Sequence, residues 1–224
     1  MSQPDILQDT VIMIERSLFD ILTTPFPQPS KRDAILAAAC LVFTEHSFEG
    51  ASMELVARRA GVARRTLYNQ FPEGKASLFH AVMLRMWQSF PAMTIAEDET
   101  VLSKPEEGLR QIGHAIADFW RPPLSIAFLR MVIGESSRFP GLMKSFYEVK
   151  APAVTAVKNY IQQLGLQGSL NISNPELAVR QFLGLIDETL IWMRVMGNEA
   201  TLPQEQIDDV IEQAIIIFVG HYKK

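Results

Sequence analysis

The fold is decided by residues 52–71, which read SMELVARRAGVARRTLYNQF. Ser52 is a residue type that caps helices, and a segment of helical periodicity follows it for about two turns. Gly61 lies in the break after this segment, where a positive φ angle costs glycine little. A second short segment of helical pattern begins at about Ala63 and ends before Phe71. The stretch therefore predicts two short helices joined by a tight turn.

Two helices of this length need a third element to pack against. The apolar side chains with the spacing to pack on a helix expected at 31–46 are Leu55, Val56, Val62, Leu67 and Phe71. This is the helix-turn-helix pattern, in which the second helix lies in the major groove with its N-terminal residues facing base edges. Arg64 and Arg65 occupy that N-terminus, where the positive helix end and two guanidinium groups favour phosphate or guanine acceptors.

The charge distribution agrees with a nucleic-acid-binding segment on an acidic protein. The 224 residues have a net charge of −4, with 48% apolar and 21% charged residues, which is a globular composition. Residues 31–80 contain seven Lys or Arg against five Asp or Glu, a local net charge of +2 that leaves −6 for the rest. The asymmetry is modest, but its sign suits a DNA-binding domain attached to an acidic body.

Over about fifty residues the chain resembles the TetR family of repressors. The matching positions are Phe48-Glu49-Gly50, Ser52, Ala57, Ala60-Gly61-Val62, Thr66-Leu67-Tyr68, Phe71, Lys75 and Leu78-Phe79. The resemblance implies DNA contacts of two kinds. Phosphate contacts are expected from Ser52, Tyr68 and Lys75. Groove contacts are expected from Arg64, Arg65, Thr66 and Asn69.

The chain departs from the family pattern at two places. Ala63 stands where the family usually has Ser or Thr, so one cap and one phosphate contact are expected to be lost. The stretch between Phe71 and Lys75 is one residue longer than usual, which puts the reach of Lys75 in question. Arg58 and Arg59 lie on the first short helix, and for them we favour a solvated helix face.

Nearly every other segment has helical period, and no alternating strand pattern occurs. We therefore expect an all-α protein in which an N-terminal three-helix helix-turn-helix domain precedes a helical-bundle domain for ligand binding and dimerisation. The expected ranges are an amphipathic helix with a Pro-rich linker at 1–29, the DNA-binding domain at 30–80 and the body at 81–224. The helix at 5–22 is unusual for the family and is expected to pack either on the body or on a partner subunit.

Helices of the second half are delimited by proline and glycine. Beyond the helix that begins at Lys75, they are expected at 106–120, 124–137, 141–164, 175–197 and 204–221, after a polar loop at 94–105. Pro152 falls inside the third of them and predicts a kink or a split. Both of the last two helices have more apolar side chains than one bundle face needs, which predicts a homodimer through 175–197 and 204–221. The alternative is a core within one chain.

Residues 128–140 read FLRMVIGESSRFP and resemble the body subgroup named after the AefR regulator. Members of that subgroup often control multidrug efflux or cell-surface genes, so this resemblance implies a target gene of that kind. The resemblance to TetR repressors implies release from DNA by a small-molecule effector that binds in the body. A cavity for an apolar or amphipathic ligand is mostly apolar with a few polar anchors. The candidate lining residues are Trp87, Phe90, Phe119, Trp120, Met131, Glu135, Tyr147 and Trp192.

Each candidate has an alternative role. The aromatic and methionine side chains also suit a plain core. Glu135 could equally form an ion pair with Arg138, three residues later on the same helix. Asp187 and Glu188 lie in an apolar stretch and could pair across a subunit interface.

Several other classes of protein are disfavoured. No apolar run is long enough for a transmembrane helix and no signal pattern begins the chain, so a cytoplasmic location without membrane association is expected. The single Cys40 is expected to be a small buried packing residue. The four histidines lack metal-ligand spacing and no nucleophile or phosphate-loop motif occurs, so no metal, cofactor or enzymatic activity is expected. The remaining alternatives are a ligand-independent regulator or activator with the same DNA-binding domain, and a helical protein-interaction module.

Overall fold

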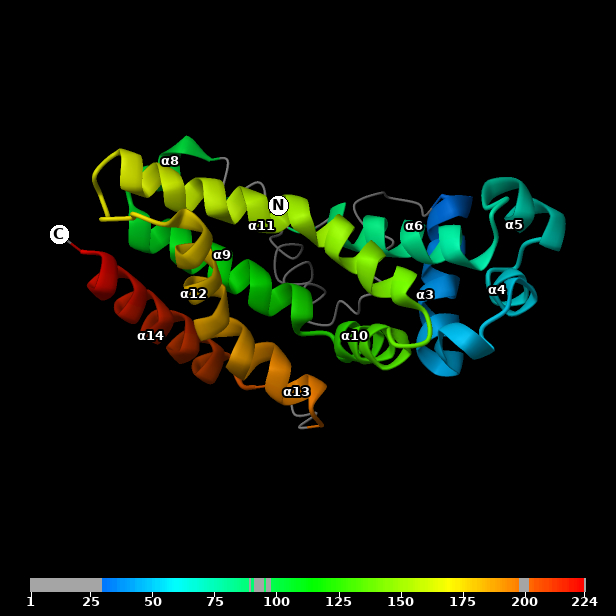
Figure 1. Cartoon of the computed structure of the whole chain (residues 1–224). Coiled ribbons are helices and arrows are strands. Elements are labelled where there is room, and N and C mark those ends of the chain that lie inside the picture. The colour runs from blue at the N-terminus through cyan, green and yellow to red at the C-terminus, as the bar shows by residue number, and fades with distance from the viewer. Residues whose placement is uncertain (1–29, 89, 91–94, 96–97, 198–201, 224) are drawn as a thin grey trace, which may run out of the picture. The chain divides into compact units, whose positions relative to one another are not determined.

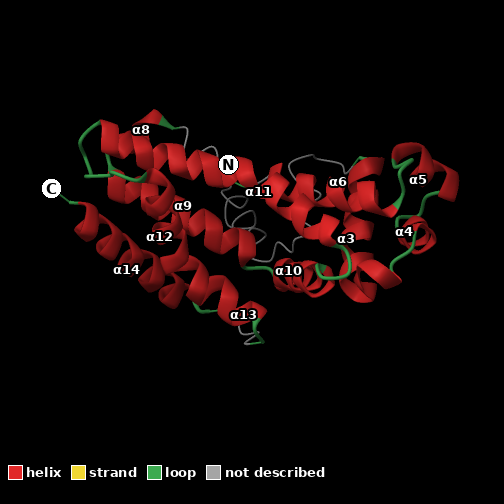
Figure 2. Ribbon diagram, viewed as in Figure 1, coloured by secondary structure: helices red, strands yellow, loops and turns green. Residues whose placement is uncertain are grey.

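The computed structural model describes residues 30–88, 90, 95, 98–197 and 202–223. Within these ranges every regular element is a helix, which confirms the all-α prediction (Figure 2). The helix expected at 5–22 and the Pro-rich linker that follows it lie outside the described residues.

The helices follow the boundaries that caps and prolines predict (Figure 1). Ser30 caps the first of them by accepting a hydrogen bond from the Asp33 N–H at 3.0 Å, and Pro105 and Pro175 occupy first-turn positions where no N–H is needed. In chain order they are α3 (Lys31–Gly50), α4 (Met53–Arg59), α5 (Arg64–Gln70), α6 (Lys75–Gln88), α8 (Glu99–Leu102), α9 (Pro105–Trp120), α10 (Pro123–Glu135), α11 (Pro140–Leu166), α12 (Pro175–Asp187), the π-helix η2 (Glu188–Trp192), α13 (Met193–Val195) and α14 (Gln204–Tyr222).

Three details differ from the sequence-based expectation. The long helix expected at 175–197 contains a π-helical turn, so it consists of α12, η2 and α13. The polar loop expected at 94–105 contains the short helix α8, which Asp98 caps through the Thr100 N–H at 2.8 Å. Pro152 does not split its helix, since α11 is continuous from Pro140 to Leu166. The carbonyl that loses its partner belongs to Glu148, four residues earlier, and both Glu148 and Pro152 are exposed residues.

The chain forms two compact units, and α10 and α11 each begin in one and end in the other. Of the described residues, the first unit contains those from Ser30 to Gln88 together with Ala127–Leu142. An aromatic cluster forms much of its core, with ring centroids 5.1–5.7 Å apart, and consists of Phe43, Phe48, Phe79, Phe128 and Phe139. Two of these rings come from 127–142, which explains why a segment from the expected body range belongs to the DNA-binding unit.

The second unit, called the body unit below, contains Phe90–Ile126 and Met143–Lys224. Helix α14 packs beside both α9 and α12. Close packing on α9 requires glycine at 108, where an added Cβ would lie 2.0 Å from the hydroxyl oxygen of Tyr160. The buried guanidinium of Arg194 donates to the carbonyls of Trp120 and Arg121 at 2.5 and 3.0 Å, and so caps the C-terminal end of α9.

No helix within the described ranges is long and apolar enough to cross a membrane. The same residues contain no cluster of His, Cys, Asp and Glu side chains that could hold a metal ion.

Candidate nucleic-acid interface and body pocket

The turn between α4 and α5 has the geometry that the sequence predicted. Gly61 adopts a φ angle of +65°, and the N–H of Val62 donates to the carbonyl of Ala57 at 3.0 Å. Of the predicted packing residues, Val56, Leu67 and Phe71 are buried while Leu55 and Val62 are half-buried. Leu67 is fully buried and fixes one side of α5 against the rest of the unit. The opposite side of α5 is thereby held toward solvent.

The solvent side of α5 presents most of the predicted DNA-contacting residues. Arg64, Arg65, Tyr68 and Asn69 are exposed, and Thr66 is half-buried. The guanidinium of Arg64 pairs with Glu54 and lies 5.7 Å from the ring centroid of Tyr68. Arg65 forms no ion pair with any residue in the described part of the chain, so its guanidinium is available to a ligand.

The two helix starts differ in how they are capped. The hydroxyl of Ser52 accepts a hydrogen bond from the Leu55 N–H at 3.2 Å, which is the N-cap arrangement for α4. Ala63 at the start of α5 provides no side-chain cap, and only its carbonyl accepts, from the Thr66 N–H at 2.9 Å. The first N–H groups of α5 therefore have no protein side chain bound to them, which suits a helix end that meets phosphate.

Lys75 is held within the protein. Its ammonium donates to the carbonyls of Phe48, Glu49 and Ala51 at 2.6, 3.1 and 3.0 Å, and lies 4.6 Å from the ring centroid of Phe48. An ammonium has three donors, so these bonds use all of them. Burial lowers the pKa of Lys75, and the carboxylates of Glu49 and Glu135 oppose that shift. The observed position makes Lys75 an anchor between the start of α6 and the C-terminal end of α3.

The segment that Lys75 anchors is conformationally strained and is bound to α10. Ser47 has φ 58° and ψ 173°, a backbone conformation in which residues other than glycine are rare. The N–H of Glu49 donates to the carboxylate of Glu135 at 3.0 Å, and the Glu49 carboxylate pairs with Arg138. Glu135 therefore binds the α3 end rather than forming the ion pair with Arg138 that was one alternative for it.

Two further predictions in this unit concern side chains outside the site. Arg58 is exposed, and Arg59 pairs with Glu45, as a solvated helix face requires. Cys40 is fully buried, and burial raises the pKa of its thiol to about 12. The prediction of a packing cysteine is confirmed.

The predicted ligand residues are distributed over both units. Trp87, Met131 and Glu135 belong to the DNA-binding unit, where the first two are buried. Phe90, Phe119 and Trp120 are buried in the body unit. The ring centroid of Phe119 lies 5.0 Å from that of Phe90 and 5.1 Å from that of Trp120. Two of the predicted residues, Tyr147 and Trp192, line the same pocket.

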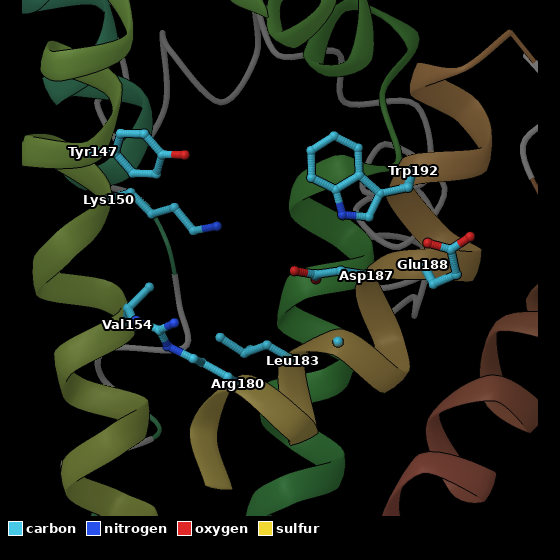
Figure 3. A pocket seen from close by; sticks show the side chains of 9 residues that line it. Tyr147, Lys150, Val154, Arg180, Leu183, Asp187, Glu188 and Trp192 are labelled. Carbon is cyan, nitrogen blue, oxygen red and sulfur yellow. The ribbon is translucent and has the colours of Figure 1, made fainter. Parts of the chain in front are cut away.

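That pocket lies in the body unit and has a volume of about 470 Å³ (Figure 3). Tyr147 and Trp192 are 64% and 43% exposed, so their rings are open to a ligand. The sequence singled out Asp187 and Glu188 as charged residues in an apolar stretch, without a decision between a ligand and a subunit interface. It missed the other lining residues, which are Lys150, Val154, Arg180, Leu183 and Gly184. A signal for part of the set exists, since Tyr147, Lys150 and Val154 are spaced three and four apart and share one face of a helix.

A helix-turn-helix with an exposed cationic second helix, in an all-helical chain with a pocket in its body, defines the class of one-chain transcriptional regulators. Models of two families match this sequence. Residues 35–82 match the bacterial regulatory proteins of the tetR family, and residues 107–224 match the C-terminal domain of AefR-like transcriptional repressors. The chain therefore belongs to the TetR family of transcriptional regulators, in agreement with the expectation that it is not an enzyme.

Solved structures support the same assignment. The flavonoid-responsive regulator FrrA is 27% identical with a TM-score of 0.67, over 85% of this chain and 96% of its own. A TetR-family regulator from Pseudomonas syringae pv. tomato has the same identity and TM-score, over 86% and 96%. A putative TetR-family regulator from Mesorhizobium loti shares the fold with a TM-score of 0.75 at 22% identity, over 86% and 96%. No functionally curated protein has a significant match.

Proposed function

We propose that this TetR-family regulator is a cytoplasmic repressor that binds a near-palindromic operator as a homodimer and is released by a small apolar or amphipathic ligand. The observation that supports DNA binding best is the exposed side of α5. It presents Arg64, Arg65, Tyr68 and Asn69 to solvent while Leu67 fixes the helix from behind. Of the two arginines, Arg65 has no competing ion pair and is the stronger candidate for base or phosphate contact.

Ser52 and Thr66 remain proposed DNA contacts, and the role of Lys75 is refined. An ammonium bonded to three carbonyls would have to break those bonds to reach a phosphate. We therefore propose that Lys75 supports DNA binding by holding α6 against the end of α3. The groups proposed to contact phosphates directly are then Ser52, Tyr68 and the uncapped N-terminal N–H groups of α5.

A homodimer through α12 to α14 is supported by apolar side chains that this part of the chain leaves exposed. Leu177 on α12 is 49% exposed, and Ile216 and Ile217 on α14 are 59% and 53% exposed. Burial of exposed aliphatic side chains against the same surface of a second copy is favourable, because it removes them from water in both subunits. A two-fold dimer would set two α5 helices about 34–36 Å apart, one turn of DNA.

Release by a ligand is supported by the pocket and by one relative. The pocket volume of about 470 Å³ lies in the range of small-molecule sites. FrrA is described as flavonoid-responsive, and an effector of comparable size is proposed here. The match to AefR-like repressors supports the repressor assignment, and an efflux or cell-surface gene as target rests on that resemblance.

Helix α11 offers a route from the pocket to the DNA-binding unit. Tyr147 and Lys150 on α11 line the pocket, while the first residues of the same helix, up to Leu142, belong to the DNA-binding unit. Just before α11, Arg138 pairs with Glu49, and the ring of Phe139 lies 5.1 Å from that of Phe48. We propose that a shift of α11 on ligand binding changes these contacts, with a coupling free energy of about 1–3 kcal/mol.

The experiment is selection of genomic DNA fragments by the purified protein, compared with an Arg64→Ala/Arg65→Ala double variant. The wild type should enrich a small set of fragments with a shared near-palindrome, and the double variant should not. An Arg58→Ala variant, which loses an exposed cation on α4 instead, should behave as the wild type. Equal enrichment by the double variant would contradict the assignment of α5, and failure of the wild type to bind any fragment at low salt would favour a protein-interaction module.

A further inference from the structure

The body pocket combines two aromatic walls with a charged floor. On one side Tyr147, Lys150 and Val154 come from α11, and on the other side the lining residues come from α12 and η2. Figure 3 shows Tyr147 and Trp192 on opposite sides of the opening, with the ammonium of Lys150 pointing into the space between them. A flat apolar group that enters here meets a ring on either side and a cation below.

The π-helix explains how Trp192 reaches this pocket. In η2 the N–H of Met193 donates to the carbonyl of Glu188, a bond to the fifth residue back. Residues five apart, such as Asp187 and Trp192, therefore come near the same face. In an uninterrupted α-helix of 3.6 residues per turn they would point about 140° apart. Single π-helical turns occur frequently at functional sites, and this one turns an exposed tryptophan to the pocket.

The charges inside the pocket do not balance one another. Lys150 points into the space, and Arg180 reaches from α12 toward Val154 on α11 (Figure 3). Asp187 also faces the space (Figure 3) and interacts electrostatically with Lys150, but its carboxylate forms no hydrogen bond or ion pair with any residue of the described chain. Glu188 lines the rim with its carboxylate turned away. Glu176 interacts with Arg180 from one turn earlier on α12 but does not line the pocket. Among the groups that face the space, two cations therefore meet one carboxylate, which leaves an excess of one positive charge there.

We propose that this pocket binds a monoanionic aromatic amphiphile, with its ring system between Tyr147 and Trp192 and its anionic group on Lys150 and Arg180. A single negative charge would neutralise the local excess, while an aromatic body would cover two exposed rings. The role of this ligand as the effector rests on the proposed function. The binding itself is a property of the body unit and can be tested without DNA.

Two fluorescent probes with the same skeleton separate shape from charge. 1-Anilinonaphthalene-8-sulfonate carries one negative charge, and N-phenyl-1-naphthylamine is its uncharged counterpart. Both are titrated into the full-length protein by fluorescence. In the wild type both probes should bind. Lys150→Gln should weaken the sulfonate at least fivefold and leave the neutral probe within twofold, whereas Lys150→Arg should restore sulfonate binding.

Matched variants control for location. Lys144→Gln removes a cation of the same helix that does not line the pocket, and it should change neither probe. Trp192→Ala should weaken both probes, because it removes an aromatic wall. The proposal is overturned if neither probe binds, if Lys150→Gln affects both probes equally or neither, or if Trp192→Ala leaves both unchanged. Thermal melting of each variant confirms that the fold is retained.

The same preparations distinguish this inference from the proposed function. Operator binding that persists while the probe pattern is absent overturns the ligand class alone. The expected probe pattern in a protein that binds no operator supports the pocket and overturns the regulator model. If both hold, sulfonate at saturating concentration should lower operator affinity in the wild type, and Lys150→Gln should need at least fivefold more probe for the same release.

Discussion

The functional side chains of α5 and those of the body pocket are positioned in different ways. Apart from Ser52, all the side chains proposed to meet DNA lie within the seven consecutive residues of α5, and one buried leucine fixes their direction. In the pocket, the aromatic and charged groups come from α11 on one side and from α12 and η2 on the other, at sequence separations of about 30 to 45 residues, and a π-helical turn sets the direction of Trp192. A local motif fixes the first surface, whereas packing and an irregular turn fix the second. Changes on α5 should therefore act on one function alone, and changes at packing positions should act on the whole unit.

The largest expected effect is on operator affinity. Arg65→Ala should lower affinity for a selected fragment about 10- to 100-fold, because a good arginine–base contact is worth about 1–3 kcal/mol. Probe binding in the body should not change. The measurement is a gel-shift titration at fixed salt, with Arg58→Ala as the matched control. Equal losses in both variants would mean that general charge, not the position on α5, determines affinity.

Lys75→Met should act through stability. Removal of the ammonium leaves the carbonyls of Phe48, Glu49 and Ala51 without their donor, which should lower the free energy of unfolding by about 1–3 kcal/mol. The slope of log affinity against log salt should stay at its wild-type value, since no phosphate contact is lost. Urea unfolding and salt titrations test both parts. A slope reduced by about one with unchanged stability would place Lys75 on a phosphate instead.

Probe binding in the pocket should depend on pH through Asp187. Burial raises the pKa of this carboxyl to about 6, and Lys150 opposes that shift. From pH 7 to pH 5 Asp187 therefore gains a proton and loses its negative charge, which removes the carboxylate that faces the anionic group of the probe. Affinity for 1-anilinonaphthalene-8-sulfonate should rise about fivefold over this interval, corresponding to about 1 kcal/mol of relieved repulsion.

Two comparisons isolate this pH effect. Asp187→Asn should bind the sulfonate tightly at both pH values, and the uncharged probe should show no pH dependence in the wild type. A wild-type pH response that persists in Asp187→Asn would assign the titration to another group.

The smallest effect concerns the strained residue before the anchored turn. Ser47→Gly should raise the free energy of unfolding by about 1 kcal/mol, because glycine adopts φ 58° without the steric cost that serine meets. Ser77→Gly, the same change inside α6, should lower it by about 0.5–1 kcal/mol. Thermal or urea unfolding measures both. Destabilisation by both changes would show that Ser47 is not under strain.

The sequence predicted the helix-turn-helix well because its determinants are local. A cap at Ser52, a glycine with positive φ at 61 and buried side chains at helical spacing are all visible within twenty residues. It predicted Tyr147 and Trp192 from residue type alone. Asp187 was noticed only as a carboxylate in an apolar stretch, and Lys150 and Arg180 could not be predicted, because the convergence of the three side chains depends on how α11 packs with α12. The hydrogen bonds of the Lys75 ammonium could not be predicted either, because its three acceptors are backbone carbonyls, which have no sequence signature.

The proposed arrangement on DNA is tested most directly by hydroxyl-radical footprinting of one selected fragment, with the protein-to-DNA ratio measured in the same complex. The account predicts two protected half-sites with centres about one helical turn apart, bound by two chains, and loss of both footprints in Arg65→Ala at the same protein concentration. A single protected half-site bound by one chain, or a footprint that Arg65→Ala leaves unchanged, would contradict it.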